Sequence, residues 1–132
     1  YEKKNIDFKK VINMQRKKTG KLFEFCCLAP AIVAKKNTKT QKEMSKVGQE
    51  IGLLFQIADD LLDVKGNKKS TGKSVKKDKK KGKSTLIKLY GYEKTLGFAL
   101  DRKKTIINKL KKYGKKSNKL IEVSDFILNR SF

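Results

Sequence analysis

Apolar positions recur every three and four residues along most of the chain, which is the spacing of one face of an α-helix. No convincing alternating stretch indicates a β-strand, and the chain contains one Pro and 9 Gly. The pattern predicts helices over residues 5–17, 22–34, 41–64, 85–90, 93–113 and 118–130. We expect an all-α fold in one domain or part of one, with Lys18-Thr19-Gly20 interrupting the helical pattern.

The predicted helix over 41–64 is apolar around most of its circumference, and such helices are buried in protein interiors. Its polar and small residues share one face, an arc of about 120° at about 100° per residue. They are Gly48, Gly52, Gln56, Asp59, Asp60 and Asp63. We therefore expect the acidic face to point into a protein cavity, with the two glycines leaving room for a ligand.

Three carboxylates within two helical turns repel one another in a low-dielectric site unless they are protonated or bind a cation. The chain contains no His, and a set of oxygen ligands favours a hard divalent ion. Asp59, Asp60 and Asp63 are therefore candidate ligands of Mg²⁺. The alternative is a charged face exposed to solvent, and the apolar remainder of the helix favours the metal site.

Residues 65–83 are rich in Gly, Ser and Lys and almost devoid of apolar side chains, which predicts a long mobile basic loop. The loop contains the pairs Gly72-Lys73 and Gly82-Lys83 and a single acid, Asp78. Lysines on a mobile loop beside an acidic metal site suit a ligand that carries several phosphate charges. The alternative is a solvated linker rich in Lys.

The chain carries 35 Lys and Arg against 13 Asp and Glu, a formal net charge of +22 over 132 residues. Such an excess of positive charge is typical of proteins that bind nucleic acid or other anionic partners. Only three of these cations are Arg, the residue usually selected for recognising bases and phosphates, and Lys is spread over nearly every segment. We therefore interpret the charge mainly as a solvated Lys-rich surface.

The absence of a long apolar stretch and the spacing of the two cysteines indicate the compartment and the redox state of the chain. No stretch reaches the roughly 20 apolar residues of a membrane-spanning helix, so we expect a soluble, cytoplasmic chain. The adjacent Cys26 and Cys27 fit neither a disulfide framework nor the spacing of a zinc or redox motif. Reduced, partly buried thiols are the expectation.

Together these motifs resemble those of the trans-isoprenyl diphosphate synthases, especially the bacterial farnesyl and geranylgeranyl type. Residues 18–23, Lys-Thr-Gly-Lys-Leu-Phe, are similar to the Lys-Thr-Gly-x-Leu-hydrophobic segment of this family. Residues 55–64 resemble its second aspartate-rich motif almost letter for letter, and the Gly-Lys pairs follow at the family's spacing. Residues 126–130 resemble its terminal helix. The resemblance implies the all-α helical bundle of the isoprenoid synthases.

The resemblance also implies an activity, the elongation of isoprenoid chains. An allylic diphosphate loses pyrophosphate, the double bond of isopentenyl diphosphate attacks the resulting carbocation, and a proton is lost. The allylic diphosphate would be bound by Lys18, Thr19, Gln56, Lys73 and Lys83. Asp59 would ligate Mg²⁺ directly, Asp60 and Asp63 would support it, and Asp78 would contact metal-bound water. The implied catalytic residues are Lys18, Thr19, Gln56 and Asp59, in a homodimer.

The chain departs from the family pattern before residue 59. A first aspartate-rich motif normally lies well over a hundred residues upstream of the second, but only 58 residues precede Asp59 and none contains such a motif. The chain also starts with Tyr1 rather than Met. We therefore expect it to be the C-terminal part of a synthase, inactive alone and with apolar helix faces exposed.

Two other functions stay open on the sequence. One is a basic helical module that binds nucleic acid or anionic surfaces, which would lose affinity steeply with added salt. The other is a relative that has kept the fold, lost catalysis and acts as a regulatory subunit. The length of the product cannot be predicted, because in this family it depends on residues near the first acidic motif.

Overall fold

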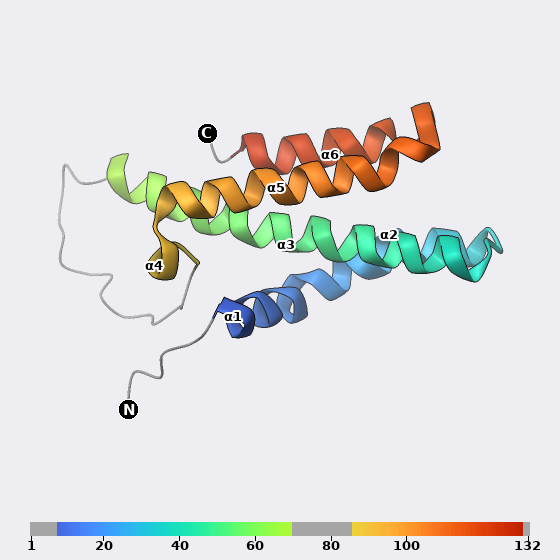
Figure 1. Cartoon of the computed structure of the whole chain (residues 1–132), viewed down its shortest axis with the longest axis horizontal. Coiled ribbons are helices and arrows are strands. Elements are labelled where there is room, and N and C mark those ends of the chain that lie inside the picture. Colours follow the sequence, from blue (N-terminus) through green and yellow to red (C-terminus); the bar gives the residue numbers. More distant parts are fainter. Residues whose placement is uncertain (1–7, 70–85, 131–132) are drawn as a thin grey trace.

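The structure, a computed structural model, describes residues 8–69 and 86–130 (Figure 1). These residues contain helices and turns but no β-strand, so the predicted all-α fold is confirmed. The α-helices are α1 (Phe8–Gln15), α2 (Lys21–Val33), α3 (Thr38–Lys69), α4 (Leu86–Tyr90), α5 (Tyr92–Leu110) and α6 (Asn118–Asn129). A π-helical turn, η1 (Arg16–Gly20), joins α1 to α2, and a 3₁₀ segment, η2 (Lys111–Ser117), joins α5 to α6.

Helix α3 is the centre of the bundle. It packs against α2 and η1 on one side and against α5 and α6 on the other, and α5 and α6 lie side by side (Figure 1). Its apolar residues supply nearly half of the buried core, as a helix that is apolar around most of its surface should. They are Val47, Ile51, Leu53, Leu54, Ile57, Ala58 and Leu61.

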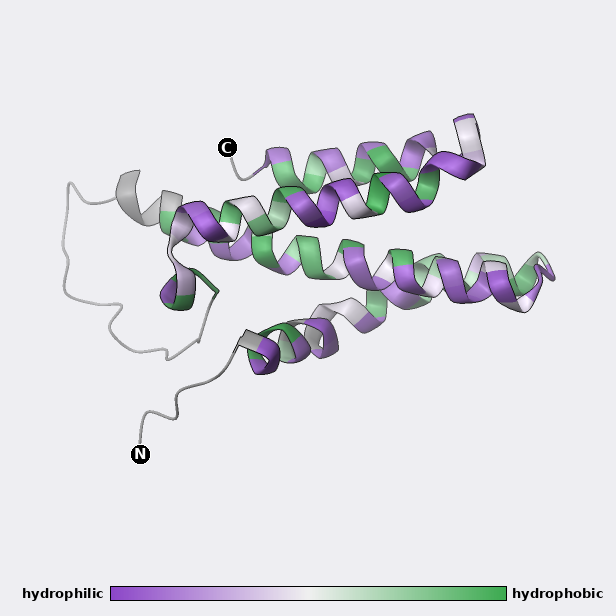
Figure 2. Ribbon diagram, viewed as in Figure 1, coloured by the Kyte–Doolittle hydropathy of each residue, from purple (hydrophilic) through white to green (hydrophobic). Residues whose placement is uncertain are grey.

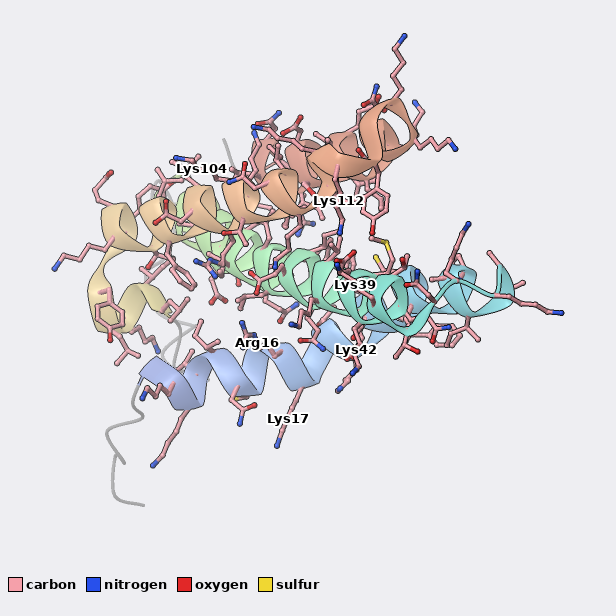
Figure 3. All side chains as sticks on the ribbon, turned by 45° about the vertical axis from the view of Figure 1, so that its right-hand side comes forward. Arg16, Lys17, Lys39, Lys42, Lys104 and Lys112 are labelled. Atoms are coloured by element: carbon pink, nitrogen blue, oxygen red, sulfur yellow. The ribbon has the colours of Figure 1, made fainter. Side chains whose placement is uncertain are left out.

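The outer helices have one buried and one polar face. Polar and apolar residues alternate around α5 and α6 in Figure 2, and Ala99, Ile106, Leu110, Ile127 and Leu128 are buried. Figure 3 shows that the cations come from many elements, because the residues it labels lie on η1, α3, α5 and η2. This distribution agrees with the interpretation of a Lys-rich surface without a single basic stripe.

Two differences from the sequence-based expectations concern the segments of the candidate site. Lys18-Thr19-Gly20 does not interrupt the helical pattern, because η1 continues from α1 into α2 as a π-helical turn. Helix α3 extends to Lys69, so the first five residues of the expected loop over 65–83 are helical. The remaining part of that loop lies outside the described residues.

The apolar surface that we expected includes four residues of α2. Leu22, Phe25 and Val33 are 63%, 67% and 82% exposed, and Ile32 adds to the same helix. Burying such side chains is worth about 1.5–3 kcal/mol each, so this surface is available to further polypeptide. In the part of the chain that the structure describes, no helix is long and apolar enough to cross a membrane.

Candidate functional site

Gly48 and Gly52 allow α3 to approach the preceding helices closely. A Cβ atom on Gly52 would lie 2.6 Å from the Cα of Gly20, and one on Gly48 would overlap the carbonyl oxygen of Phe23. Real Cβ atoms do not approach backbone atoms so closely. The expectation that these glycines leave room for a ligand is therefore wrong: the backbone of η1 and α2 fills that space.

The close contact brings the Lys-Thr-Gly segment onto the acidic face of α3. Gly52, Gln56 and Asp59 follow one another along that face, so Asp59 lies about 10 Å beyond Gly52 at 1.5 Å per residue. The rings of Phe23 and Phe55, 5.4 Å apart, extend the contact between α2 and α3 towards Asp59. Gln56 is 9% exposed and Thr19 is half-buried.

The aspartates are less enclosed than the sequence predicts. The side chain of Asp59 is 47% exposed, Asp60 is half-buried and Asp63 is exposed. The expected cavity is thus not closed by the described residues. Periodicity identified the face of the helix correctly, but the cover over that face has to come from other polypeptide or from a ligand.

Arg130, at the end of α6, binds Asp59. Its Nη2 atom donates a hydrogen bond of 2.7 Å to Asp59 Oδ1, and its guanidinium lies over the Phe55 ring, 4.1 Å from the centroid. From the sequence we assigned Arg130 to the terminal helix and predicted no functional role for it. The two partners are 71 residues apart, and no spacing rule connects them.

The other two arginines also bind a carboxylate on α3. Arg16 Nη2 lies 3.3 Å from Glu50 Oε1, and Arg102 Nη1 lies 3.4 Å from Glu50 Oε2, which ties η1 and α5 to α3. The Glu50 side chain is only 13% exposed. All three arginines thus pair with acids of this chain, so their contacts give the nucleic-acid alternative no support.

The donor set fits a metal ion that is shared with a ligand. The described residues contain no group of three or more His, Cys, Asp and Glu side chains that could hold a metal by themselves. Mg²⁺ is usually bound through one or two carboxylates plus substrate phosphates and water. Asp59 and Asp63, one turn apart on α3, provide such carboxylates on an accessible face.

Several predicted site residues cannot be compared with the structure. Lys73, Lys83 and Asp78 lie outside the described residues, and of Lys18 the structure describes only the helical backbone. Of the predicted set, the structure describes the side chains of Thr19, Gln56, Asp59, Asp60 and Asp63. The contact of Gly20 with Gly52 puts the residue after Thr19 on the face of α3 that carries Gln56 and Asp59.

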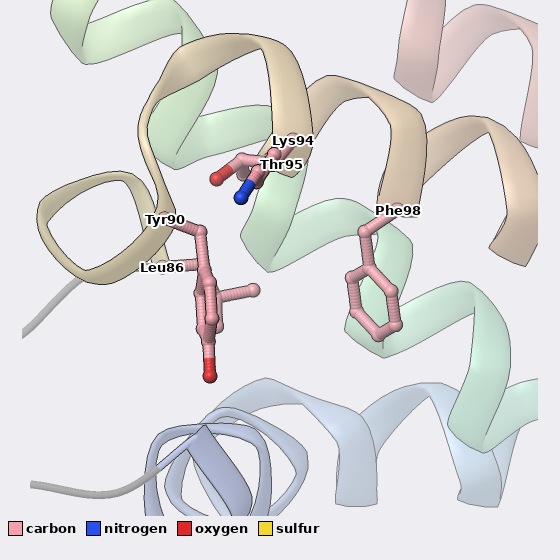
Figure 4. Close-up of a pocket in the computed structure, with 5 residues that line it drawn as sticks. All are labelled: Leu86, Tyr90, Lys94, Thr95 and Phe98. Carbon is pink, nitrogen blue, oxygen red and sulfur yellow. The ribbon is translucent and has the colours of Figure 1, made fainter.

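A separate pocket of about 280 Å³ lies between α4 and α5 (Figure 4). Five described residues line it: Leu86, Tyr90, Lys94, Thr95 and Phe98. Tyr90 and Phe98 point towards α1 in Figure 4, and no aspartate of the α3 motif is among these residues. Its mostly apolar lining suits apolar side chains better than a diphosphate.

The clearest pKa shifts lie away from the acidic face. Hydrogen bonds from Lys21, Ser45 and Gln49 hold the pKa of Glu24 at about 2, which stabilises its charged form between α2 and α3. Burial raises the pKa of the Cys27 thiol, so Cys27 is a poor nucleophile. Both cysteines are unpaired thiols, as expected, although Cys26 is exposed.

The bundle has the all-α fold of the isoprenoid synthases. It is similar to the crystal structure of a geranyltransferase from Helicobacter pylori 26695, with a TM-score of 0.72 and 21% sequence identity, over 98% of this chain and 41% of that one. The family model described as polyprenyl synthetase matches residues 1–126. The chain therefore belongs to the polyprenyl synthetase family.

Similar proteins carry the names of prenyl diphosphate synthases. A geranylfarnesyl diphosphate synthase of Aeropyrum pernix is 40% identical over 90 residues, which are 68% of this chain and 28% of that protein. A short chain isoprenyl diphosphate synthase of Methanocaldococcus jannaschii is 37% identical over 116 residues, 88% of this chain and 34% of that protein. The chain thus spans about a third of the length of these relatives.

Proposed function

We propose that the chain carries the part of a trans-prenyltransferase that binds the allylic diphosphate and Mg²⁺. The whole enzyme would condense this substrate with isopentenyl diphosphate, as a farnesyl or geranylgeranyl type of synthase. The observation that carries the proposal is the contact between Gly20 and Gly52, which sets the Lys-Thr-Gly segment on the same face of α3 as Gln56 and Asp59. The names of the relatives support it.

Lys18, Thr19 and Gln56 have the chemistry to bind the diphosphate end of the allylic substrate. A Lys ammonium neutralises phosphate charge, while a hydroxyl and an amide donate hydrogen bonds that orient the oxygens. Lys73 and Lys83 add two more cations in this proposal. Breaking the carbon–oxygen bond builds negative charge on the leaving pyrophosphate, so pre-organised donors lower the barrier.

Asp59 and Asp63 would hold the metal through carboxylate oxygens, with Asp60 and Asp78 in support. A bound Mg²⁺ supplies positive charge that stabilises the leaving pyrophosphate. In this proposal the side chains of Asp59 and Asp63 keep the diphosphate end of the allylic substrate at the exposed face of α3. In this proposal the proton lost at the end of the reaction passes to the departing pyrophosphate, as the resemblance to the family implies, so this part of the site needs no His.

The chain alone is expected to be inactive, because its relatives are about three times as long and the first aspartate-rich motif is missing here. The exposed apolar residues of α2 are a surface on which additional helices of a synthase could pack. We also propose that the complete enzyme is a cytoplasmic homodimer.

A chimera tests the proposal. The N-terminal part of the Aeropyrum pernix relative is joined to this chain in place of the matching segment, and transfer of labelled isopentenyl diphosphate to an allylic diphosphate is measured with Mg²⁺. We expect elongation by the chimera and none by the chain alone. A chimera that folds, as judged by circular dichroism, but transfers no prenyl group would contradict the proposal.

A further inference from the structure

Contacts that do not involve Asp59 hold Arg130 in place. Its Nε atom donates to the carbonyl oxygen of Ile127 at 3.3 Å, and Nη2 donates to the carbonyl oxygen of Phe55 at 3.5 Å. The guanidinium also stacks on the Phe55 ring, 4.1 Å from its centroid, and the side chain is only 26% exposed. The cation is therefore fixed next to the acidic face before any ligand binds.

Arg130 changes what Asp59 can bind. A carboxylate offers about four lone-pair sites, so the single bond from Nη2 to Oδ1 leaves room for a metal ion on the same side chain. A divalent cation on Asp59 would lie close to the guanidinium, and like charges repel. A metal ion that arrives with a diphosphate brings compensating negative charge, and guanidinium groups bind phosphate oxygens well.

We propose that Arg130 is a positioning residue that orients Asp59 and lowers its affinity for a free metal ion. The site then takes up metal and diphosphate together and stays metal-poor without substrate. The inference rests on the proposed function and adds the coupling between its two ligands. Coupling of this kind typically changes affinities about 5- to 150-fold.

The test measures metal and diphosphate binding separately. The 132-residue chain and its Arg130→Gln variant are titrated with MnCl₂ alone, followed by electron paramagnetic resonance, and with inorganic pyrophosphate at saturating Mg²⁺, followed by calorimetry. We expect Arg130→Gln to bind free Mn²⁺ about tenfold more tightly and pyrophosphate about tenfold more weakly than the parent. Equal weakening of both ligands, or no change in either, overturns the inference.

Two further variants separate the effect of net charge from the effect of the position of the charge. Arg102→Gln removes the same charge from a side chain of matched exposure, 27% against 26%, that pairs with Glu50, so both affinities should stay at the parent values. Arg130→Lys keeps the charge, and we expect free-metal affinity close to that of the parent. A tighter free-metal affinity in Arg102→Gln, equal to that of Arg130→Gln, overturns the inference because net charge alone would then explain it.

The outcomes also separate this inference from the proposed function. A parent chain that binds neither Mn²⁺ nor pyrophosphate overturns the proposed function and this inference with it. A parent chain that binds both, with Arg130→Gln indistinguishable from it, overturns the role of Arg130 and leaves the diphosphate site standing.

Discussion

Gly52 and Gly20 meet backbone to backbone, and a Cβ atom on Gly52 would lie 2.6 Å from the Cα atom of Gly20. No side chain fits between α3 and η1 at this point. The contact fixes the distance between the Lys-Thr-Gly segment and the acidic face of α3, so one close approach serves both packing and the candidate site.

Replacing Gly52 with Ala should destabilise the bundle. Ala gains up to about 1 kcal/mol over Gly from helix propensity. Overpacking against a backbone atom costs about 1–3 kcal/mol, so the net effect is a lower free energy of unfolding, which urea unfolding can measure. The variant should also bind pyrophosphate more weakly, because η1 has to move away from α3 at Gly52.

Gly97 provides the matched control. It lies inside α5, and a Cβ atom there would meet nothing within 4 Å. Gly97→Ala should therefore raise the free energy of unfolding by about 0.5–1 kcal/mol through helix propensity alone. If Gly52→Ala were as stable as Gly97→Ala, the close contact between α3 and η1 would not exist in solution.

Glu50 should be the acid whose loss costs most stability among the ion pairs of the described residues. Its side chain is 13% exposed and faces both Arg16 and Arg102. Glu50→Gln leaves two cations near a nearly buried amide. We expect the free energy of unfolding, measured in urea, to fall by about 1–3 kcal/mol.

Glu122 is the surface comparison for Glu50. It pairs with Lys119 at 60% and 90% exposure of the two side chains, where such pairs contribute about 0–1 kcal/mol. Glu122→Gln should therefore change the unfolding midpoint little. Equal losses in the two variants would mean that the cluster around Glu50 is no stronger than a surface pair.

The sequence predicted the role of α3 well because periodicity reports which side of a helix is apolar. The apolar residues from Val47 to Leu61 that this pattern assigns to the core are buried, except the half-buried Phe55. Gln56 and Asp59 share the face that the pattern assigns to them. The cover over that face could not be predicted, because it depends on polypeptide distant in sequence. Asp59 and Asp63 are consequently more exposed than expected.

The roles of the small and basic residues were not readable from spacing. Gly48 and Gly52 on a polar face are compatible with a ligand space or with a close helix contact, and only the fold distinguishes the two. The pairing of Arg130 with Asp59 spans 71 residues, so it depends on how α6 folds back onto α3. Thr19-Gly20 predicted an interruption, whereas the chain continues through a π-helical turn.

Acid should weaken the contact between α2 and α3 through Glu24. Its pKa lies at about 2 in the folded chain against an ordinary 4.5, because Lys21, Ser45 and Gln49 hydrogen-bond the carboxylate. The unfolded chain therefore binds more protons between these values, so stability is present above pH 4.5 and falls towards pH 2. Unfolding midpoints measured across this range should show the loss, and Glu24→Gln should remove that part of the slope.

A matched acid checks this assignment. Glu93 is exposed in the first turn of α5. Glu93→Gln removes the same charge without touching the contact between α2 and α3, so the contribution of Glu24 to the slope between pH 4.5 and 2 should remain. If Glu24→Gln retained the full slope, the hydrogen bonds from Lys21 and Ser45 would not persist in solution.

Asp59 should be indispensable for prenyl transfer. In the chimera with the Aeropyrum pernix segment, Asp59→Ala removes the carboxylate that is proposed to bind the metal and leaves Arg130 without its 2.7 Å partner. Losing one electrostatic contributor to a leaving group typically costs about a hundredfold or more in turnover, so kcat should fall by at least that factor. Asp101→Ala, an exposed acid on α5, should leave kcat unchanged. Near-normal turnover of Asp59→Ala would refute the assignment of this residue.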